Sequence, residues 1–213
     1  GGLEDKSLRF VYLFKRLKSQ IFALLESMVD EFSVSRFKPI FFEKDISGAY
    51  FELDGQKIQL SGRIDRVDIW ESEGKKYLRV VDYKTGNTNF NYGDVEYGLG
   101  IQLLLYMFAL AAQDVSIVPA GVLYIPALSK TIRVDCGRTR EKILEDAKRS
   151  AKRSGLLLGD LDVLFAMEDI PEGGKARFIP VAVSGKAEQR RLSKDNRYVV
   201  SKQHFEIIKK HVG

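Results

Sequence analysis

The segment from Lys76 to Lys84 constrains the fold most, because its centre is apolar and β-branched. Residues 78–81 read Leu-Arg-Val-Val, a composition typical of a strand in the middle of a sheet. A turn over residues 72–75 precedes this segment, and strand-like residues up to Trp70 precede the turn. The two segments therefore predict two paired strands within a β-sheet.

Further strand patterns lie upstream of this pair. Residues 38–46 look extended after Pro39. Residues 50–53 and 57–60 flank Asp54-Gly55, which is a strong signal for a hairpin turn. We expect the second of these strands to continue through Gly62 as far as Trp70.

Two segments predict long helices. Residues 6–32 place apolar side chains such as Leu17, Ile21 and Leu24 near helical spacing, with lysine and arginine between them. Those basic side chains either contact phosphates or form a solvated face. Residues 94–113 are so apolar that their helix should be largely buried, with Asp94 as its cap.

The remaining segments complete a mixed α/β fold. Residues 117–125 predict an apolar strand, residues 139–154 a basic helix, and residues 173–196 a mobile glycine- and charge-rich stretch. Ser201 looks like the cap of a last helix that ends near Val212. We expect a single domain with an N-terminal helix (1–36), a core (37–127) and a less regular C-terminal part (128–213).

Composition limits the class of protein. The 213 residues are 45% hydrophobic, which suits one domain with a sizeable core. The net charge of +5 is compatible with a polyanionic partner without requiring one. Cys136 is the only cysteine, so an iron–sulfur cluster cannot be held within this chain alone.

No apolar run reaches the roughly 18 residues of a membrane span, and no signal peptide is evident, so we expect a cytoplasmic protein without a membrane partner.

Charged residues interrupt the two strands of the predicted pair. Residues 62–68 read Gly-Arg-Ile-Asp-Arg-Val-Asp, and residues 80–86 read Val-Val-Asp-Tyr-Lys-Thr-Gly. Side chains two apart on a strand share a face, so Asp82 and Lys84 should point the same way. If the strands pair, Asp65 comes near them. The three residues then form either a structural salt bridge or a catalytic site.

The catalytic alternative has a clear chemistry. Carboxylate oxygens suit Mg²⁺ or Mn²⁺, and such a metal polarises a phosphate and lowers the pKa of a bound water. A lysine beside it can orient or help deprotonate that water, or stabilise negative charge on phosphate oxygens. Phosphodiester hydrolysis is the reaction that these residue types fit.

Together with residues 102–106, Gln-Leu-Leu-Leu-Tyr, these two motifs resemble the RecB-type nuclease domain of the PD-(D/E)xK superfamily. The resemblance is nearest to the C-terminal nuclease domain of AddB subunits of ATP-dependent helicase–nucleases. It covers about residues 37–127, and more weakly residues 154–160 and 199–205. It implies a restriction-endonuclease-like fold, a mixed central sheet flanked by helices. It also implies a Mg²⁺-dependent (Mn²⁺ being possible in its place) exodeoxyribonuclease that partners a helicase subunit of an AddAB-like complex.

The resemblance also implies roles for residues at the strand ends. Asp65 and Asp82 would be metal ligands, the backbone carbonyl of Tyr83 a further ligand, and Lys84 the catalytic lysine. The implied substrate is single-stranded DNA that leaves the helicase during recombination and double-strand-break repair.

Three further residues are candidates for DNA binding. Gln102 and Tyr106 match the family's Gln-x-x-x-Tyr motif and share one face of a helix, because they lie four residues apart. A polar edge on a core helix is the alternative reading of that pair. Arg63 shares the strand face of Asp65, which makes it a candidate phosphate contact, whereas Asp68 lies on the other face and is expected to be structural.

Two departures from the family pattern predict an incomplete site. RecB-like nucleases usually have an upstream histidine that completes the metal site, yet the only histidines here are His204 and His211. Glu26, Glu31 or Glu43 are possible substitutes, and nothing in the spacing selects one. AddB-type proteins also often hold an iron–sulfur cluster with four cysteines, which this chain lacks. A non-cleaving DNA- or helicase-binding module that keeps the nuclease fold is therefore the alternative function.

Overall fold

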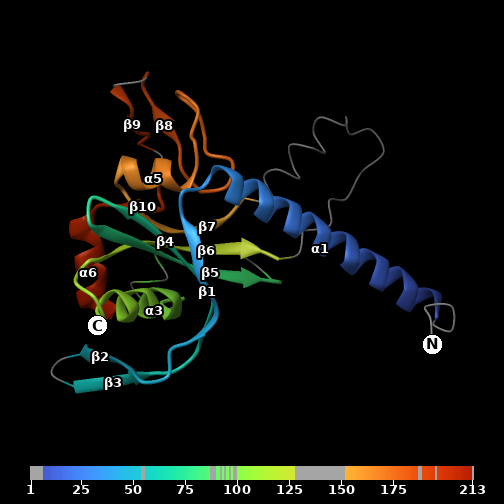
Figure 1. Ribbon diagram of the computed structural model, residues 1–213, viewed down its shortest axis with the longest axis horizontal. Coiled ribbons are helices and arrows are strands. Elements are labelled where there is room, and N and C mark those ends of the chain that lie inside the picture. Colours follow the sequence, from blue (N-terminus) through green and yellow to red (C-terminus); the bar gives the residue numbers. More distant parts are fainter. Residues whose placement is uncertain are drawn as a thin grey trace.

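A mixed six-stranded β-sheet forms the centre of the molecule, with strand order β1-β4-β5-β6-β7-β10 (Figure 1). The computed structural model describes residues 7–53, 56–86, 90, 91, 93, 95, 97, 100–127, 152–186, 189–194 and 196–212. The strands of the sheet are β1 (Lys38–Asp45), β4 (Arg63–Ser72), β5 (Lys75–Lys84), β6 (Ile117–Pro126), β7 (Ser154–Leu158) and β10 (Val199–Val200).

The sheet combines parallel and antiparallel pairing. β1, β4 and β5 pair antiparallel, β5 and β6 pair parallel, β6 and β7 pair antiparallel, and β7 and β10 pair parallel. β5 lies in the middle of the sheet, as its apolar sequence predicts. The predicted mixed α/β fold with a central sheet is confirmed.

Helices cover both faces of the sheet. α3 (Gln102–Ala111) packs against β5 and β6, and it contacts α6 (Lys202–Val212) through the rings of Phe108 and Phe205. On the other face, the C-terminal end of α1 (Leu8–Val34) adjoins α5 (Leu161–Met167), because Arg36 N–H donates to the Ala166 carbonyl. Figure 1 shows the N-terminal half of α1 extending away from the sheet.

The helix ends follow from local capping. The Ser7 side chain accepts a hydrogen bond of 3.3 Å from Phe10 N–H at the start of α1. Ser201 caps α6 as predicted, because its Oγ accepts from His204 N–H at 3.2 Å.

The predicted buried helix is α3, but it begins only at Gln102, so the prediction of a continuous helix from residue 94 is wrong. Gly100 has a φ of +68°, a left-handed conformation that ends helical winding.

Two small hairpins stand apart from the main sheet. β2 (Ala49–Leu53) pairs with β3 (Gln56–Leu60), as predicted, and β8 (Val183–Ser184) pairs with β9 (Arg191–Leu192). The predicted continuation of the second strand through Gly62 is wrong, because β3 ends before β4 begins. The chain changes partner there: β3 pairs with β2, whereas the Gly62 carbonyl accepts from Ile46 N–H at the start of the pairing with β1.

The C-terminal part is more regular than its composition suggests. Residues 173–196 contain β8 and β9, and the Asn196 side chain binds both backbone groups of Ala182. The predicted helix over 139–154 does not reach Ser154, which begins β7, and its residues up to 151 lie outside the described part, as do Asp94 and Cys136.

The apolar core lies on both faces of the sheet, against α3 on one side and against α5 on the other. Its members without measurable exposure include Val80, Val81, Leu104, Met107 and Val122. Burying such side chains contributes about 1.5–3 kcal/mol each, so this packing fixes the position of β5 within the sheet. Within the described ranges, no helix combines the length and apolarity that a membrane span needs.

Candidate active site

Asp82 and Lys84 lie together at the C-terminal end of β5. Lys84 Nζ is 2.8 Å from Asp82 Oδ2, and the side chain of Lys84 is 46% exposed while that of Asp82 is 22% exposed. The predicted shared face is therefore confirmed. The pair is accessible to solvent, so a substrate can reach it.

Asp65 joins this strand end through the backbone. Its Oδ2 accepts a hydrogen bond of 2.7 Å from Tyr83 N–H. The pairing of β4 and β5 ends at Arg66 and Val81, so beyond that point a carboxylate, and not a strand partner, satisfies the Tyr83 amide. Because the N–H and C=O of one residue point to the same edge of a strand, the Tyr83 carbonyl faces that edge too.

Tyr124 is a neighbour that the sequence motifs do not indicate. It lies opposite Asp82 in the parallel pairing of β5 and β6, and Lys84 Nζ is 5.7 Å from its ring centroid. Burial, together with the Asp82 charge, raises the pKa of the Tyr124 hydroxyl to about 12. The signal that could have found it is its place near the end of the next parallel strand, since parallel strands end at one edge.

Gln102 and Tyr106 contact each other, as their spacing predicts. Gln102 Nε2 donates to Tyr106 Oη at 2.6 Å, and the Tyr106 hydroxyl donates to the Ser61 carbonyl at 3.2 Å. The pair lines an open hollow of about 460 Å³ beside the junction of β3 and β4. The glutamine therefore has a structural partner, and the tyrosine holds the chain just before β4.

Arg63 is paired with carboxylates of β1. Its Nε is 3.0 Å from Asp45 Oδ1, and its Nη1 is 3.6 Å from Glu43 Oε2. The hydrogen bond to Asp45 is the main cause that raises the pKa of Arg63, followed by the charges of Asp45 and Glu43. Any phosphate that approaches Arg63 therefore also meets two negative charges.

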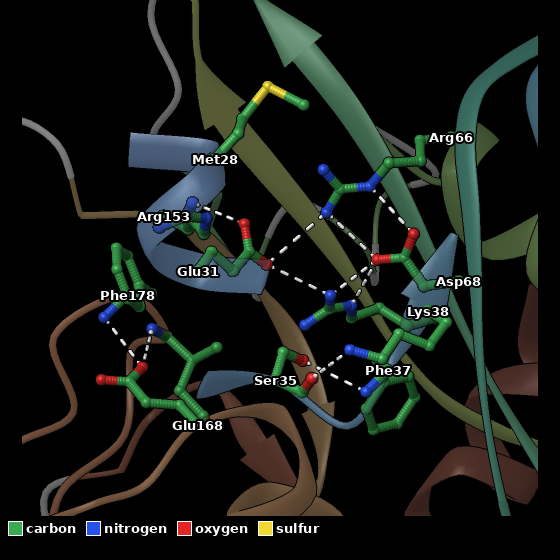
Figure 2. Close-up of polar contacts among 12 residues, drawn as sticks. Met28, Glu31, Ser35, Phe37, Lys38, Arg66, Asp68, Arg153, Glu168 and Phe178 are labelled. Carbon is green, nitrogen blue, oxygen red and sulfur yellow. Dashed lines mark hydrogen bonds and ion pairs between the residues drawn. The ribbon is translucent and has the colours of Figure 1, made fainter. Parts of the chain in front are cut away.

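A buried charge network lies on the opposite face of the sheet from Asp82, because Arg79 and Asp82 are three residues apart on β5. Figure 2 shows the Glu31 carboxylate between Arg153 and Arg66, with Asp68 facing Arg66. Every side chain in it is at most 1% exposed. The network consists of Glu31 from α1, Arg66 and Asp68 from β4, Arg79 from β5 and Arg153 before β7.

The distances in the network are those of strong ion pairs. Arg153 Nη2 is 2.6 Å from Glu31 Oε2, and Arg79 Nη2 is 2.6 Å from Asp68 Oδ2. Arg79 also reaches Glu31 Oε1 at 3.1 Å, and Arg66 Nε is 2.9 Å from Asp68 Oδ1. Asp68 is thus a structural residue, as its strand face suggests.

The arginines govern the ionisation of Glu31. Burial is the largest influence and by itself raises the pKa, but the charges of Arg79, Arg153 and Arg66 together outweigh it and leave the pKa of Glu31 lowered. The Glu31 carboxylate is therefore bound by these arginines. It does not take the place, beside Asp82, of the upstream histidine that RecB-like nucleases usually have. Glu43 is likewise paired with Arg63.

The donor set at the strand end fits a hard divalent cation. The carboxylates of Asp65 and Asp82 and the Tyr83 carbonyl carry oxygen atoms of the kind that Mg²⁺ prefers, and Mg²⁺ keeps several waters when few protein ligands are present. In the part of the chain that is described, no three His, Cys, Asp or Glu side chains gather closely enough to hold a metal. Water would therefore complete the coordination of any ion bound there.

Comparisons with known proteins agree with this geometry. A family model described as the PD-(D/E)XK nuclease superfamily matches residues 3–183. The chain is 33% identical over 224 residues to an ATP-dependent helicase/deoxyribonuclease subunit of Clostridium acetobutylicum, and 32% identical over 224 residues to the same subunit of Clostridium novyi. Both alignments cover 100% of this chain and 19% of the relative, so the chain spans about a fifth of the length of these relatives.

Proposed function

This chain belongs to the PD-(D/E)XK nuclease superfamily, and from that premise we propose that Asp65, Asp82 and Lys84 form a metal-dependent site that hydrolyses DNA phosphodiester bonds. The observation that carries the proposal is the Tyr83 amide. It holds Asp65 beside the strand end where Lys84 Nζ lies 2.8 Å from Asp82. Two carboxylates, a carbonyl and an ammonium thus share one accessible edge.

Each residue has a role in the proposed reaction. Asp65, Asp82 and the Tyr83 carbonyl would hold Mg²⁺ or Mn²⁺, which polarises the phosphate and acidifies a bound water. In the hydrolysis, the oxygen of a water molecule bonds to phosphorus while the bond from phosphorus to the leaving nucleotide oxygen breaks. The proton lost by that water passes to solvent, and the leaving oxygen takes up a proton. The Lys84 ammonium stabilises the negative charge that develops on the phosphate oxygens.

The proposed substrate is single-stranded DNA delivered by a helicase partner in recombination or double-strand-break repair. The support is the name of the relatives, which joins a helicase and a deoxyribonuclease in one assembly. Under this proposal Gln102, Tyr106 and Arg63 contact the DNA. Arg63 would do so only after releasing Asp45, to which it is bound at 3.0 Å.

A non-cleaving DNA- or helicase-binding module is the second candidate. The observation that favours it is the ion pair between Lys84 and Asp82, because a lysine held by its neighbour at 2.8 Å is also a stable structural arrangement. The two candidates differ in one measurable property, the hydrolysis of DNA.

The test is cleavage of end-labelled single-stranded DNA by the full chain with Mg²⁺ or Mn²⁺. We expect Lys84→Ala to lower the rate about 10²–10³-fold, the loss typical when one stabilising donor is removed. Lys75→Ala is the matched control, because Lys75 lies at the opposite end of β5. Equal rates for the parent chain and Lys84→Ala contradict the catalytic role, and DNA binding without cleavage in either metal supports the binding module.

A further inference from the structure

A basic pocket lies near the proposed active site. It has a volume of about 520 Å³ and is bounded by the start of β7, the loops at residues 173–175 and 180–183, and the segment before β10. Its described lining contains no acidic residue. Its cationic side chains are Lys152, Lys175 and Arg197, with Arg153 of the buried network in its wall.

Among the described residues, no carboxylate forms an ion pair with the exposed cations of this pocket. Within the described residues, Lys152, Lys175 and Arg197 have no carboxylate within 4.0 Å. Burial and then the charge of Lys175 lower the pKa of Lys152, while the charge of Glu168 opposes this. Glu168 itself is occupied, since its carboxylate accepts from the backbone amides of residues 177, 178 and 179.

At Ser154, one edge of the pocket reaches the face of the sheet that carries Asp82. Asp82 is opposite Tyr124 in the pairing of β5 and β6, and Tyr124 is opposite Ser154 in the pairing of β6 and β7. Directly opposite residues point to the same face, and Ser154 lines the pocket. Two strand spacings amount to about 10 Å, so the pocket begins about that far from Asp82 across the sheet.

Aromatic rings connect the two places. The Phe90 ring stacks on Tyr124 with centroids 6.0 Å apart and meets the edge of Tyr198 at 6.2 Å. Phe90 and Tyr198 line the pocket, while Tyr124 is the neighbour of Lys84. Cations combined with aromatic rings are the usual composition of a surface that binds single-stranded nucleic acid.

We propose that the pocket formed by Lys152, Lys175 and Arg197 binds a backbone phosphate of the DNA strand that is cleaved at Asp82 and Lys84. The identity of that strand rests on the proposed nuclease function. A separation of about 10 Å is short enough for one DNA strand to bind at the pocket and at the strand end of β5 together. The pocket would thus anchor the strand close to the bond that breaks.

The test is DNA binding without catalysis. The affinity of the full chain for a fluorescein-labelled oligothymidylate of about 16 nucleotides is measured by fluorescence anisotropy in EDTA, across a salt series. The variant is Lys175→Ala/Arg197→Ala, in which both side chains are exposed and the fold should be unaffected. The control is Lys75→Ala, which removes a similar exposed charge at the far end of β5.

We expect the double variant to weaken binding about 10-fold or more at low salt, and the control to change it less than about twofold. The slope of log affinity against log salt should become shallower by about 0.7, because the variant loses one phosphate contact and each such contact on a single strand accounts for about 0.7. The charge reversal Lys175→Glu should weaken binding further at an unchanged unfolding temperature. Wild-type affinity and slope in the double variant would overturn the proposal.

Three further outcomes distinguish this inference from free-phosphate binding and from the proposed nuclease function. If the variants lose affinity for inorganic phosphate, measured by calorimetry, but not for the oligonucleotide, the pocket binds free phosphate and the proposal is wrong. If Lys84→Ala loses cleavage while the pocket variants bind DNA normally, the nuclease function stands and the pocket inference fails. If the pocket variants lose DNA binding although the parent chain cleaves nothing, the pocket inference stands and the nuclease function fails.

Discussion

The Tyr83 hydroxyl accepts a hydrogen bond of 2.7 Å from Nη1 of the buried Arg66. The backbone amide of the same tyrosine donates to Asp65, and its chain neighbours are Asp82 and Lys84. Tyr83 therefore joins the buried charge network on one face of the sheet to the candidate site at the strand end. Changes in the network should reach the site through this residue.

Replacing Tyr83 with phenylalanine tests that connection. Tyr83→Phe leaves a buried Arg66 donor without its partner, which should cost about 1–3 kcal/mol in the free energy of unfolding, measured by urea denaturation. Cleavage should fall less than in Lys84→Ala, because the amide that holds Asp65 remains. Tyr12→Phe, at a position 64% exposed on α1, is the control and should change neither property. Unaltered stability of Tyr83→Phe would show that the bond to Arg66 contributes nothing.

Glu31 is the carboxylate on which three arginines converge. Glu31→Gln removes one partner of buried ion pairs and leaves guanidinium charges uncompensated, so it should destabilise the fold by about 3–5 kcal/mol. Glu26→Gln, on an exposed position of the same helix, should change the free energy of unfolding by less than about 0.5 kcal/mol. Comparable stabilities of the two variants would contradict the role assigned to the network.

The lowered pKa of Glu31 also predicts a pH dependence. The unfolded chain releases this proton near the ordinary value of 4.5, and the folded chain only at lower pH. The contribution of Glu31 to stability is therefore complete above about pH 4.5 and is lost as the pH falls below it. The difference in unfolding free energy between the parent chain and Glu31→Gln should shrink over that range. A difference that grows on acidification would show that the pKa is raised instead.

Local periodicity explains which parts of this site could be predicted from the sequence. Asp82 and Lys84 share a face because side chains alternate along a strand, and Gln102 and Tyr106 meet because a helix brings residues four apart together. Each of these pairs lies within a single strand or helix. The local sequence pattern is therefore enough to predict both side-chain arrangements.

The contacts that sequence patterns do not predict join elements far apart in the chain. Arg79 and Arg153 reach Glu31 across 48 and 122 residues, and no local pattern marks such a meeting. The break between β3 and β4 is hidden for the same reason, since Tyr106 contacts Ser61 from 45 residues away. The bond between Asp65 and Tyr83 depends on where the pairing of β4 and β5 stops, which the residue types do not specify.

Gly62 gives a prediction about that break. A Cβ at Gly62 would lie 1.9 Å from the Tyr106 hydroxyl oxygen, so Gly62→Ala must displace the ring and its bonds to Gln102 and Ser61. We expect a loss of about 1–3 kcal/mol in unfolding free energy. The control is Gly86→Ala, where nothing lies within 4 Å of the added carbon.

A double-mutant cycle assigns the cause of that loss. In a Tyr106→Ala background the added methyl group no longer meets a ring, so Gly62→Ala should then cost much less. An equal cost in both backgrounds would mean that backbone conformation, and not the tyrosine, excludes a side chain at this position.

Tyr124 provides a titration that reports on Asp82. Because burial and the Asp82 charge raise its pKa to about 12, Tyr124 should stay protonated above pH 10, where an ordinary tyrosine ionises. The folded state then holds this proton more tightly than the unfolded state, so the stabilising effect is complete below about pH 10 and disappears as the pH rises toward 12.

Asp82→Asn should lower the pKa of Tyr124 only in part, since burial is the larger cause. The measurement is the phenolate absorbance of the parent chain minus that of Tyr124→Phe, and Glu26→Gln should leave this difference titration unchanged. No movement in Asp82→Asn would show that the Asp82 charge does not act on this ring, and so would weaken the assignment of Tyr124 to the site.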